Sequence, residues 1–384
     1  MGAPQSRILE LCVALQSRGW QVCVVTAMPN YPSGKIFESY CRKGFLKEYI
    51  NDIEVLRYTL YPSNSRKAIP RMLSMLSFSF TSLFSVFRVR TFNPNFIITE
   101  SPPLTLAYTG LFLSFCSGSK HIMNVSDIWP LSALELGAIN KGLLYNLLES
   151  MERCTYRQSF ACMGQSDEIL SHVENQGARR SILFRNGVDS TRFVPVQYTH
   201  RTKLRIVYMG LLGIAQGILE LCRNMNFFEL GYEFHVYGQG AERAELESLV
   251  VLEGELKSIF LHSPISRDKV PQELVNYDLT IIPLIKPIRG AVPSKIYEAM
   301  AAGLPILFAG GGEGAKIIQQ HEVGWIVNPS DFDAMKSKLI EIHNLGPEQL
   351  KIIKEKARHT ALYEFDRNLQ VEKLNNFLQS ELLS

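Results

Sequence analysis

The segment with the clearest chemical pattern is VPSKIYEAMAAGLPIL, which begins at Val292. Ser294 is a good helix N-cap residue, so we expect a helix to begin there, with Lys295 in its first turn and Glu298 one turn further on. The helix dipole disfavours a cation in the first turn unless an anion such as a phosphate is bound there. A carboxylate can also accept hydrogen bonds from two ribose hydroxyls. The pattern predicts a nucleoside diphosphate site, and a solvated Lys and Glu on an ordinary helix are the alternative.

Glycines follow two apolar stretches that we expect to form strands. Gly210, Gly213 and Gly217 follow the first stretch, and Gly238 follows the second. Glycine allows the backbone to approach a diphosphate closely, and the free N–H groups of a helix N-terminus attract anions. The spacing differs from the G-x-G-x-x-G pattern of dinucleotide sites. Tight-turn glycines in a packed α/β unit therefore remain the alternative.

Two carboxylates follow apolar strands in the first half of the chain. Asp127 lies between one such strand and Trp129-Pro130, and Glu100 ends the strand before it. A carboxylate at the carboxyl end of a strand points toward the ligand edge of an α/β sheet, where it could bind an acceptor hydroxyl or act as a base. The alternatives are a loop or cap role for Asp127 and a rigid turn at Glu100, which we favour slightly.

Two further charged residues lie beside these motifs. Arg289 is in the loop before Lys295 and could meet a phosphate, although a surface arginine is equally expected. Glu313 adjoins three glycines and could face a sugar, but we expect it to be exposed.

The sequence has no motif that is typical of a metal site. No C-x-x-C or H-x-x-x-H cluster suggests zinc, and no Asp-x-Asp motif lies near the predicted cleft, so we predict no metal.

The elements that position these residues alternate between strands and helices. In the second half, this alternation predicts a parallel sheet with right-handed crossovers, whose ligands bind beyond the carboxyl ends of the strands. We predict domains at 1–196 and 203–365, and a helix at about 366–384 that packs back on the first domain. The strands are expected at 21–26, 95–99, 120–125, 159–163, 181–184, 205–209, 233–237, 258–262, 279–284, 305–308 and 325–327. The helices are expected at 7–18, 140–157, 241–250, 267–277, 295–302 and 314–320, and from about 217.

Charge is distributed unevenly along the 384 residues. Residues 1–195 contain 20 Lys and Arg against 14 Asp and Glu, whereas the remainder contains 20 against 23. A basic first half suggests an anionic partner, such as a membrane surface, a lipid diphosphate or a nucleic acid. A solvated surface explains the same excess. The sequence does not open on a basic and then apolar run, so we expect no signal peptide.

The apolar segment at 72–87, MLSMLSFSFTSLFSVF, raises the question of membrane contact. Its 16 residues are fewer than the roughly 20 that a spanning helix needs. A polar stripe recurs at helical spacing, formed by Ser74, Ser77, Thr81, Ser85 and Arg88. With its flanking Lys and Arg residues, the segment is typical of an amphipathic helix on an anionic leaflet, or of a core helix in an α/β domain.

The order and spacing of motifs along nearly the whole chain resemble glycosyltransferase family 4. The matching motifs are R-x-x-E-L at 7–11, RGW-Q-V-x-V-V-T at 18–26, PNYP at 29–32, SPP at 101–103, DIWP at 127–130, NGVD at 186–189 with Phe193, YMG at 208–210, G-x-G at 238–240 and the segment from Val292. Members of this family are retaining enzymes with the GT-B fold. The resemblance therefore implies two Rossmann-like domains that face a cleft. The resemblance is strongest to bacterial O-antigen, capsule and colanic-acid transferases, including those that transfer N-acetyl-L-fucosamine.

Three departures from the family pattern change what the resemblance implies. Family members carry an Arg and a Lys where this chain has Leu211 and Gln216, so Lys295 would be the main diphosphate cation and Gln216 would line the donor site. The first Glu of the family's E-x7-E motif is Gly290 here, which leaves Glu298 alone. The family also opens with a strand before R-x-x-E-L. The first domain would lack this central strand, which would expose hydrogen-bonding groups on two neighbours. Either the start codon is misassigned, which we favour, or the protein is truncated and unstable.

The resemblance implies a retaining, metal-independent transferase with no cofactor besides its donor substrate. The donor would be a nucleotide-sugar, with UDP-sugar favoured, and the acceptor a saccharide carried on a lipid. We expect surface polysaccharide synthesis, no nucleic-acid partner, and a cytoplasmic location that includes peripheral contact with the inner face of the membrane. A GT-B-fold nucleotide-sugar epimerase and a non-catalytic or truncated homologue are the alternatives.

Overall fold

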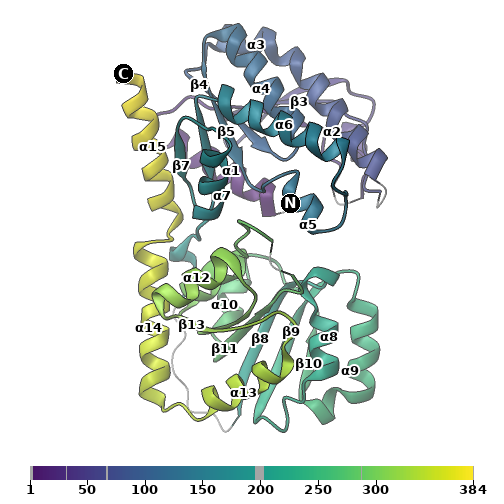
Figure 1. Cartoon of the computed structure of the whole chain (residues 1–384), viewed down its shortest axis with the longest axis vertical. Helices are drawn as coiled ribbons and strands as arrows, with labels where there is room; N and C mark the ends of the chain where they lie inside the picture. Colours follow the sequence, from purple (N-terminus) through teal and green to yellow (C-terminus); the bar gives the residue numbers. More distant parts are fainter. Residues whose placement is uncertain (1–2, 32, 66–67, 195–202, 287, 384) are drawn as a thin grey trace. The chain divides into compact units, whose positions relative to one another are not determined.

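The computed structural model describes residues 3–31, 33–65, 68–194, 203–286 and 288–383. It divides into two compact α/β units (Figure 1). Unit 1 consists of Met1–Arg185 with Val371–Ser384, and unit 2 consists of Asn186–Gln370. The stretch between the two predicted domains, residues 197–202, lies outside the described residues. The boundary between the units lies earlier in the chain, after Arg185.

Unit 2 is built on one sheet of six parallel strands, in the order β10-β9-β8-β11-β12-β13. Neighbouring residues of the central strands enter two different core clusters: Ile206 and Ile281 enter one, and Val207 and Ile282 the other. A parallel sheet covered on both faces needs such continuous apolar strands. The predicted α/β class with a parallel sheet is confirmed. The strands are β8 (Leu204–Leu211), β9 (Tyr232–Gln239), β10 (Ile259–His262), β11 (Leu279–Pro283), β12 (Ile306–Ala309) and β13 (Gly324–Val327).

Helices connect and cover these strands. The helix predicted at 241–250 is longer in the structure, and the one predicted at 267–277 shrinks to five residues. The helices of unit 2 are α8 (Ile218–Asn224), α9 (Arg243–Lys257), α10 (Val270–Leu274), α11 (Ser294–Ala302), α12 (Gly312–His321), α13 (Phe332–His343) and α14 (Pro347–Tyr363).

Unit 1 contains two sheets rather than one. The first has the order β1-β3-β2, and the second is a parallel sheet of order β4-β5-β6-β7. Among the described residues, β1 pairs only with β3 and β4 pairs only with β5. The strands are β1 (Cys23–Ala27), β2 (Phe45–Ile50), β3 (Ile53–Tyr58), β4 (Phe96–Ser101), β5 (Lys120–Val125), β6 (Ala161–Gly164) and β7 (Ser181–Leu183).

The pair β2–β3 is an antiparallel hairpin that the sequence did not predict. Its two-residue turn is formed by Asn51 and Asp52, whose φ angles are 49° and 61°. Two successive positive φ angles are typical of the tight turns that match the twist of a hairpin, and Asn and Asp tolerate them better than most residues. The hairpin gives the first sheet its antiparallel edge.

Helix α15 (Arg367–Leu383) extends from unit 2 into unit 1. Its Val371, Leu374 and Leu378 join a core cluster with Ile122 and Met163 of the second sheet. Trp20 Nε1 also donates a 2.9 Å hydrogen bond to Asn375 Oδ1. The remaining helices of unit 1 are α1 (Ala3–Gln16), α2 (Ala68–Ser82), α3 (Val86–Phe92), α4 (Leu104–Ser117), α5 (Leu131–Glu135), α6 (Leu143–Gln158) and α7 (Asp167–Asn175).

Candidate functional site

Helix α11 presents the two charged residues of the strongest motif at the carboxyl end of the unit 2 sheet. The helix begins at Ser294, and its N-cap is Pro293, which makes no side-chain cap hydrogen bond. The prediction that Ser294 is the N-cap is therefore wrong by one residue. The backbone of Pro293 is already extended, with ψ of 126°, so the helical turn begins directly after it. Lys295 still lies in the first turn.

The side chain of Lys295 lies against the end of strand β8. A Cβ atom placed on Gly210 would be 2.2 Å from Lys295 Cε and 2.6 Å from its Nζ, so only glycine leaves room for this cation. The Nζ is 5.2 Å from the ring centroid of Tyr208. Tyr208 Oη in turn donates a 2.6 Å hydrogen bond to the carbonyl oxygen of Leu211. Gly210 and Lys295, predicted separately, are therefore in contact.

Glu298 lies one turn after Lys295 and is half-buried. Burial raises the pKa of Glu298, and the positive charges of Lys295, Arg267 and Arg192 oppose that rise. Burial likewise lowers the pKa of Lys295, against the opposing effect of the Glu298 charge. Each group thus favours the charged form of the other, in surroundings that disfavour both charges. Perturbed titratable groups of this kind are typical of functional sites.

The glycines of the neighbouring loops allow close backbone contacts. A Cβ on Gly238 would lie 2.0 Å from the Gly210 carbonyl oxygen, and one on Gly240 would lie 2.1 Å from that of Leu212. The Leu212 amide donates a 2.9 Å hydrogen bond to Gln239 O, which ties the two loops together. These contacts favour the packing interpretation of Gly238. The loop after β9 supports the loop that carries Gly210.

The loop after β8 continues through Gly213 to Gly217. Gly217 adopts a φ of +62° directly before α8, and a Cβ on Gly213 would lie 2.9 Å from Gln216 Oε1. The Ile285 amide donates a 2.9 Å hydrogen bond to Ala215 O, which brings this loop to the end of β11. Gln216 Oε1 is buried and has no hydrogen-bond partner among the described residues. The loop therefore offers one unsatisfied acceptor near glycine backbone.

Unit 1 has a separate polar cluster at the carboxyl ends of β4 and β5, centred on Glu100. Arg7 and Ser126 both contact its Oε1, and Asn124 Nδ2 donates to its Oε2 at 2.6 Å. Arg7 Nη2 also donates to Ser126 Oγ at 2.9 Å. Burial and the neighbouring Glu100 charge raise the pKa of Asp127, while Arg7 lowers it. Glu100 is therefore part of a polar network rather than only of a turn.

Comparison with known proteins places both halves of the chain in one functional class. Residues 193–360 match the family described as "Glycosyl transferases group 1", and residues 2–187 match "Glycosyl transferase 4-like domain". The chain belongs to the glycosyltransferases of the GT-B fold.

Individual relatives of this glycosyltransferase are distant in sequence but similar in fold. The Escherichia coli protein WcaI, named as a colanic acid biosynthesis glycosyl transferase, is 26% identical over 314 residues, which cover 77% of this chain and 76% of WcaI. Sucrose-phosphate synthase from Thermosynechococcus elongatus superposes with a TM-score of 0.76 at 15% identity, covering 100% of this chain and 94% of its own. Anabaena HepE in complex with UDP and glucose gives a TM-score of 0.65 at 15% identity, covering 97% and 95%.

Arg289 and Glu313, the two remaining predicted residues of the glycosyltransferase, differ in exposure. Arg289 is exposed on the loop between β11 and α11. The prediction that Glu313 is exposed is wrong, because this residue is 2% exposed in the first turn of α12. The glycines before it pack closely: a Cβ on Gly310 would lie 2.3 Å from the Phe308 ring. The glycine-rich segment is thus a tightly packed turn rather than an open loop.

Sequence reasoning missed several polar residues that organise this glycosyltransferase. Arg7 and Asn124 of the Glu100 cluster come from segments with no motif except the R-x-x-E-L opening. In unit 2, Arg243 Nη1 donates to Gly238 O at 2.7 Å and His262 O at 2.8 Å, which holds the ends of β9 and β10 together. An arginine at the start of a helix after a G-x-G turn was the available signal.

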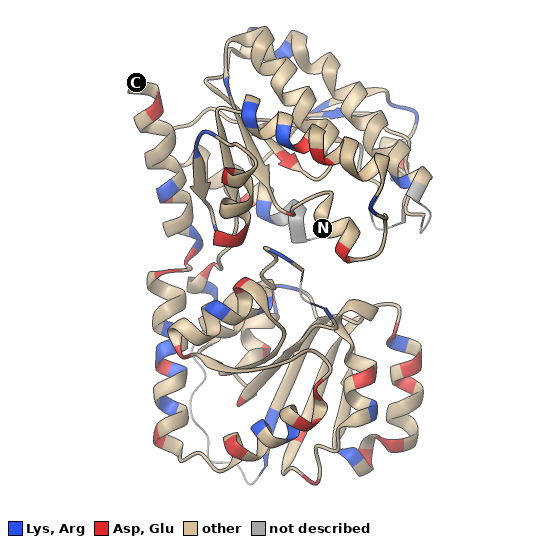
Figure 2. Cartoon of the chain, viewed as in Figure 1, with Lys and Arg blue, Asp and Glu red and all other residues tan. Residues whose placement is uncertain are grey.

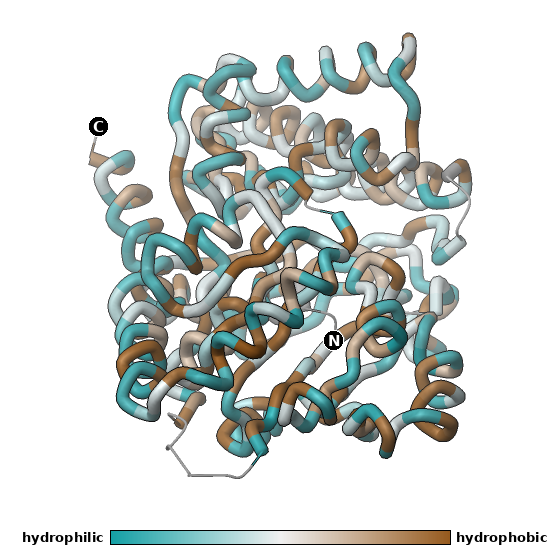
Figure 3. The backbone as a smooth tube through the Cα atoms, turned by 60° about the horizontal axis from the view of Figure 1, so that its bottom comes forward, coloured by the Kyte–Doolittle hydropathy of each residue, from teal (hydrophilic) through white to brown (hydrophobic). Residues whose placement is uncertain are grey.

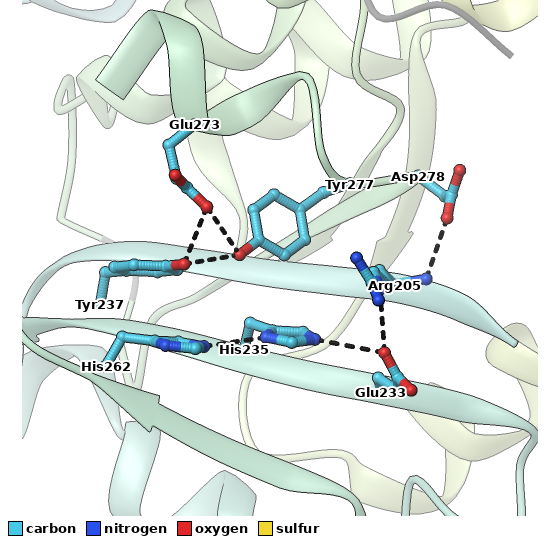
Figure 4. A network of polar contacts seen from close by, with 8 residues as sticks. All are labelled: Arg205, Glu233, His235, Tyr237, His262, Glu273, Tyr277 and Asp278. Carbon is cyan, nitrogen blue, oxygen red and sulfur yellow. Dashed lines mark hydrogen bonds and ion pairs between the residues drawn. The ribbon is translucent and has the colours of Figure 1, made fainter. Parts of the chain in front are cut away.

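A larger polar network lies on one face of the unit 2 sheet (Figure 4). Tyr237 Oη donates to Glu273 Oε1 at 2.9 Å, and His235 Nδ1 lies 2.9 Å from His262 Nε2. The amide of Arg205 donates a 3.0 Å hydrogen bond to Asp278 Oδ2, and its Nε donates to Glu233 Oε2 at 2.9 Å. These bonds link β8, β9, β10 and the α10 region. The network is a structural support for the sheet.

Proposed function

We propose that this chain is a retaining transferase that moves a sugar from a UDP-sugar to a saccharide acceptor carried on a lipid, in surface polysaccharide synthesis. The observation that carries the proposal is the placement of Lys295 against Gly210, with Glu298 one turn away on the same helix. The complex of HepE with UDP and glucose supports the choice of UDP. The name of WcaI supports the pathway class.

The donor would bind to unit 2 by complementary charge. Lys295 and the N-terminal amides of α11 would hold the diphosphate, and Glu298 would accept hydrogen bonds from the two ribose hydroxyls. When the bond between the sugar and the diphosphate breaks, its electron pair passes to a phosphate oxygen. A fixed cation and helix N–H groups stabilise that developing charge most strongly where water is excluded. This scheme needs no metal, so metal independence stays a prediction.

The acceptor side is assigned to unit 1. Asp127 would bind the acceptor hydroxyl or take up its proton, because it follows β5 beside the Glu100 cluster and because burial and the Glu100 charge raise its pKa, which makes it a better base. The new glycosidic bond forms on the face that the diphosphate leaves, as retention requires. The Glu100 cluster would keep Asp127 in a polar environment. A panel of UDP-sugars would identify the sugar that is transferred.

The proposal is tested by calorimetry with UDP, GDP and TDP, using Glu298→Gln and the wild-type protein. Loss of two charged hydrogen bonds should weaken UDP binding by about 10- to 100-fold. A matched control is Glu255→Gln, which removes an exposed carboxylate on α9 of the same unit.

A ribose analogue makes the same test specific. UDP that lacks both ribose hydroxyls should bind wild type and Glu298→Gln equally well, since the contact in question is absent from both complexes. Unchanged UDP affinity in Glu298→Gln would sink the assignment. Formation of an epimerised nucleotide-sugar in the absence of acceptor would instead support the epimerase alternative.

A further inference from the structure

Helices α2 and α3 form an apolar segment of unit 1 that the catalytic scheme does not use. The helical stretch Ile69–Phe92 has 24 residues and is long and apolar enough to cross a membrane, and only 17% of its most apolar window is buried. Figure 3 colours the backbone by hydropathy and shows hydrophilic and hydrophobic residues interspersed along the chain. Large side chains along it are exposed: Ile69 is 67% exposed, Phe80 64%, Phe84 56% and Phe87 73%. A core helix would bury these side chains.

Polar side chains of the same segment face the protein, among them Thr81 and Ser85 of the predicted stripe and Ser79 beside it. Ser79 Oγ lies 2.8 Å from Thr105 Oγ1 of α4, and Thr109 Oγ1 donates a 2.9 Å hydrogen bond to Ser79 O. Thr81 Oγ1 donates to Thr59 O at 2.7 Å, and Ser85 is fully buried. A surface helix of a soluble protein has the opposite polarity, with apolar residues inward and polar residues outward. The segment is therefore built to present apolar side chains outward.

The neighbouring helix α4 contributes to the same kind of surface. It packs against α2 through the Ser79 contacts and exposes Phe112 by 46% and Phe115 by 88%. Helices α2, α3 and α4 contain no Asp or Glu, and they are drawn almost entirely in tan in Figure 2. Exposed aromatic side chains on adjacent helices form a surface that water solvates poorly.

Charge indicates what this surface contacts. From Val55 to Thr99 the sequence has no Asp or Glu and six basic residues: Arg57, Arg66, Lys67, Arg71, Arg88 and Arg90. Arg71 and Arg90 are exposed near the two ends of the apolar segment, while Arg88 pairs with Glu54. Apolar side chains flanked by arginines complement a layer of acyl chains under anionic headgroups.

We propose that the apolar face, defined as Ile69, Met72, Leu76, Phe80, Phe84 and Phe87, docks unit 1 onto an anionic lipid bilayer. The segment lies in the plane of the headgroups rather than spanning the membrane. Spanning would break the hydrogen bonds of Ser79 and Thr81 to unit 1 and move polar groups into hydrocarbon. The inference rests on the proposed lipid-carried acceptor for its purpose, but its evidence is independent of the donor site.

The test is flotation of the full-length protein with vesicles of phosphatidylcholine alone or mixed with phosphatidylglycerol. We expect strong binding to the mixed vesicles and weaker binding at high salt, because screening reduces the arginine contribution. A variant with Phe80→Ser, Phe84→Ser and Phe87→Ser should lose at least tenfold in partitioning. Equal binding of this variant and wild type, or no binding of wild type to anionic vesicles, would overturn the proposal.

A matched control removes equally exposed apolar side chains from unit 2. Val251→Ser, Leu252→Ser and Leu256→Ser alter residues of α9 that are 86%, 76% and 73% exposed, and vesicle binding should be unchanged. All six positions are exposed, so the melting temperature should stay the same. If wild type is a dimer that does not bind vesicles and the phenylalanine variant is a monomer, the face is a self-association surface and the proposal fails.

Vesicle binding and donor binding are measured separately, which keeps the two proposals distinguishable. Flotation is done without nucleotide, and UDP calorimetry is done without vesicles. The triple phenylalanine variant should bind UDP as wild type does. A protein that binds vesicles but not UDP contradicts only the donor assignment, and one that binds UDP but not vesicles contradicts only the docking surface.

Discussion

Unit 1 and unit 2 are both α/β structures, yet their sheets differ in number and in how deeply the strands are buried. Unit 2 has one continuous parallel sheet, and every residue of β11 and β12 is buried. Unit 1 divides its strands between two sheets, and every residue of β1 is only half-buried. The comparison shows that alternating strands and helices do not by themselves guarantee a single covered sheet. The motifs of the proposed donor site lie on the more completely packed unit.

The largest expected effect separates the chemistry of the two units. Lys295→Met keeps the length of the side chain and removes its charge, so we expect the turnover rate to fall by about 100- to 1000-fold and UDP binding to weaken. Asp127→Asn in unit 1 should impair transfer while UDP affinity stays unchanged. Calorimetry with UDP, combined with transfer kinetics at varied acceptor concentration, checks both outcomes. Weakened UDP binding in Asp127→Asn would contradict the division of roles.

The second expected effect concerns acid stability, since burial lowers the pKa of His121 in unit 1 and of His235 and His262 in unit 2. Burial lowers the pKa of His121 in unit 1 to about 4, and burial followed by the His262 charge lowers that of His235 in unit 2 to about 4. Between pH 6.5 and 4 the unfolded chain binds more protons than the folded one, so stability falls as pH falls. The loss reaches roughly 3 kcal/mol for each of these two histidines and ends below pH 4.

The histidine variants assign this loss to a unit. His121→Gln should flatten the pH dependence of unit 1 unfolding, and His235→Gln should flatten that of unit 2. Trp20 and Trp129 lie in unit 1 and Trp325 in unit 2, so urea melts followed by fluorescence in a Trp325→Phe background report on unit 1. An unchanged slope in His121→Gln would show that another group controls the acid response of unit 1.

The smallest expected effect compares one substitution in two strands. Val207→Ala in β8 removes methyl groups from a fully buried side chain, and we expect a loss of about 2–3 kcal/mol in the free energy of unfolding. Val24→Ala in the half-buried β1 should cost less than about 1 kcal/mol. Urea denaturation of both variants measures the difference. Equal losses would mean that β1 is as tightly packed as the sheet of unit 2.

The sequence predicts the fold best where apolar runs end at polar turns. Strand β5 has the predicted bounds, and α11 begins within one residue of its prediction. The hairpin β2–β3 was missed because the exposed face of β2 carries large apolar residues, Phe45 and Tyr49, so its pattern does not resemble a simple alternation. Pairing with β3 and the tight turn settle its structure instead.

The candidate site was predictable to the extent that parallel strands bring their carboxyl ends together. That rule predicted that the loops of Gly210 and Lys295 converge, and the two residues are in contact. It could not show that Arg7 pairs with Glu100, because the two are 93 residues apart and no motif joins them. Helical spacing also predicted the polar stripe in the apolar segment at 72–87, but it did not show which side the stripe faces. Packing against α4 decides that direction, and it is a property of the folded unit.

The divided sheets of unit 1 also affect how the protein should behave in concentrated solution. In the described part of the chain, β1 and β4 each keep one edge without a ladder partner. Edge strands can recruit extended segments of other chains, and natural proteins discourage this with charged or proline residues. The sequence of β1, CVVTA, has neither. Unit 1 is therefore where aggregation on heating should begin, and a single lysine in β1 is the first substitution to try for a better-behaved sample.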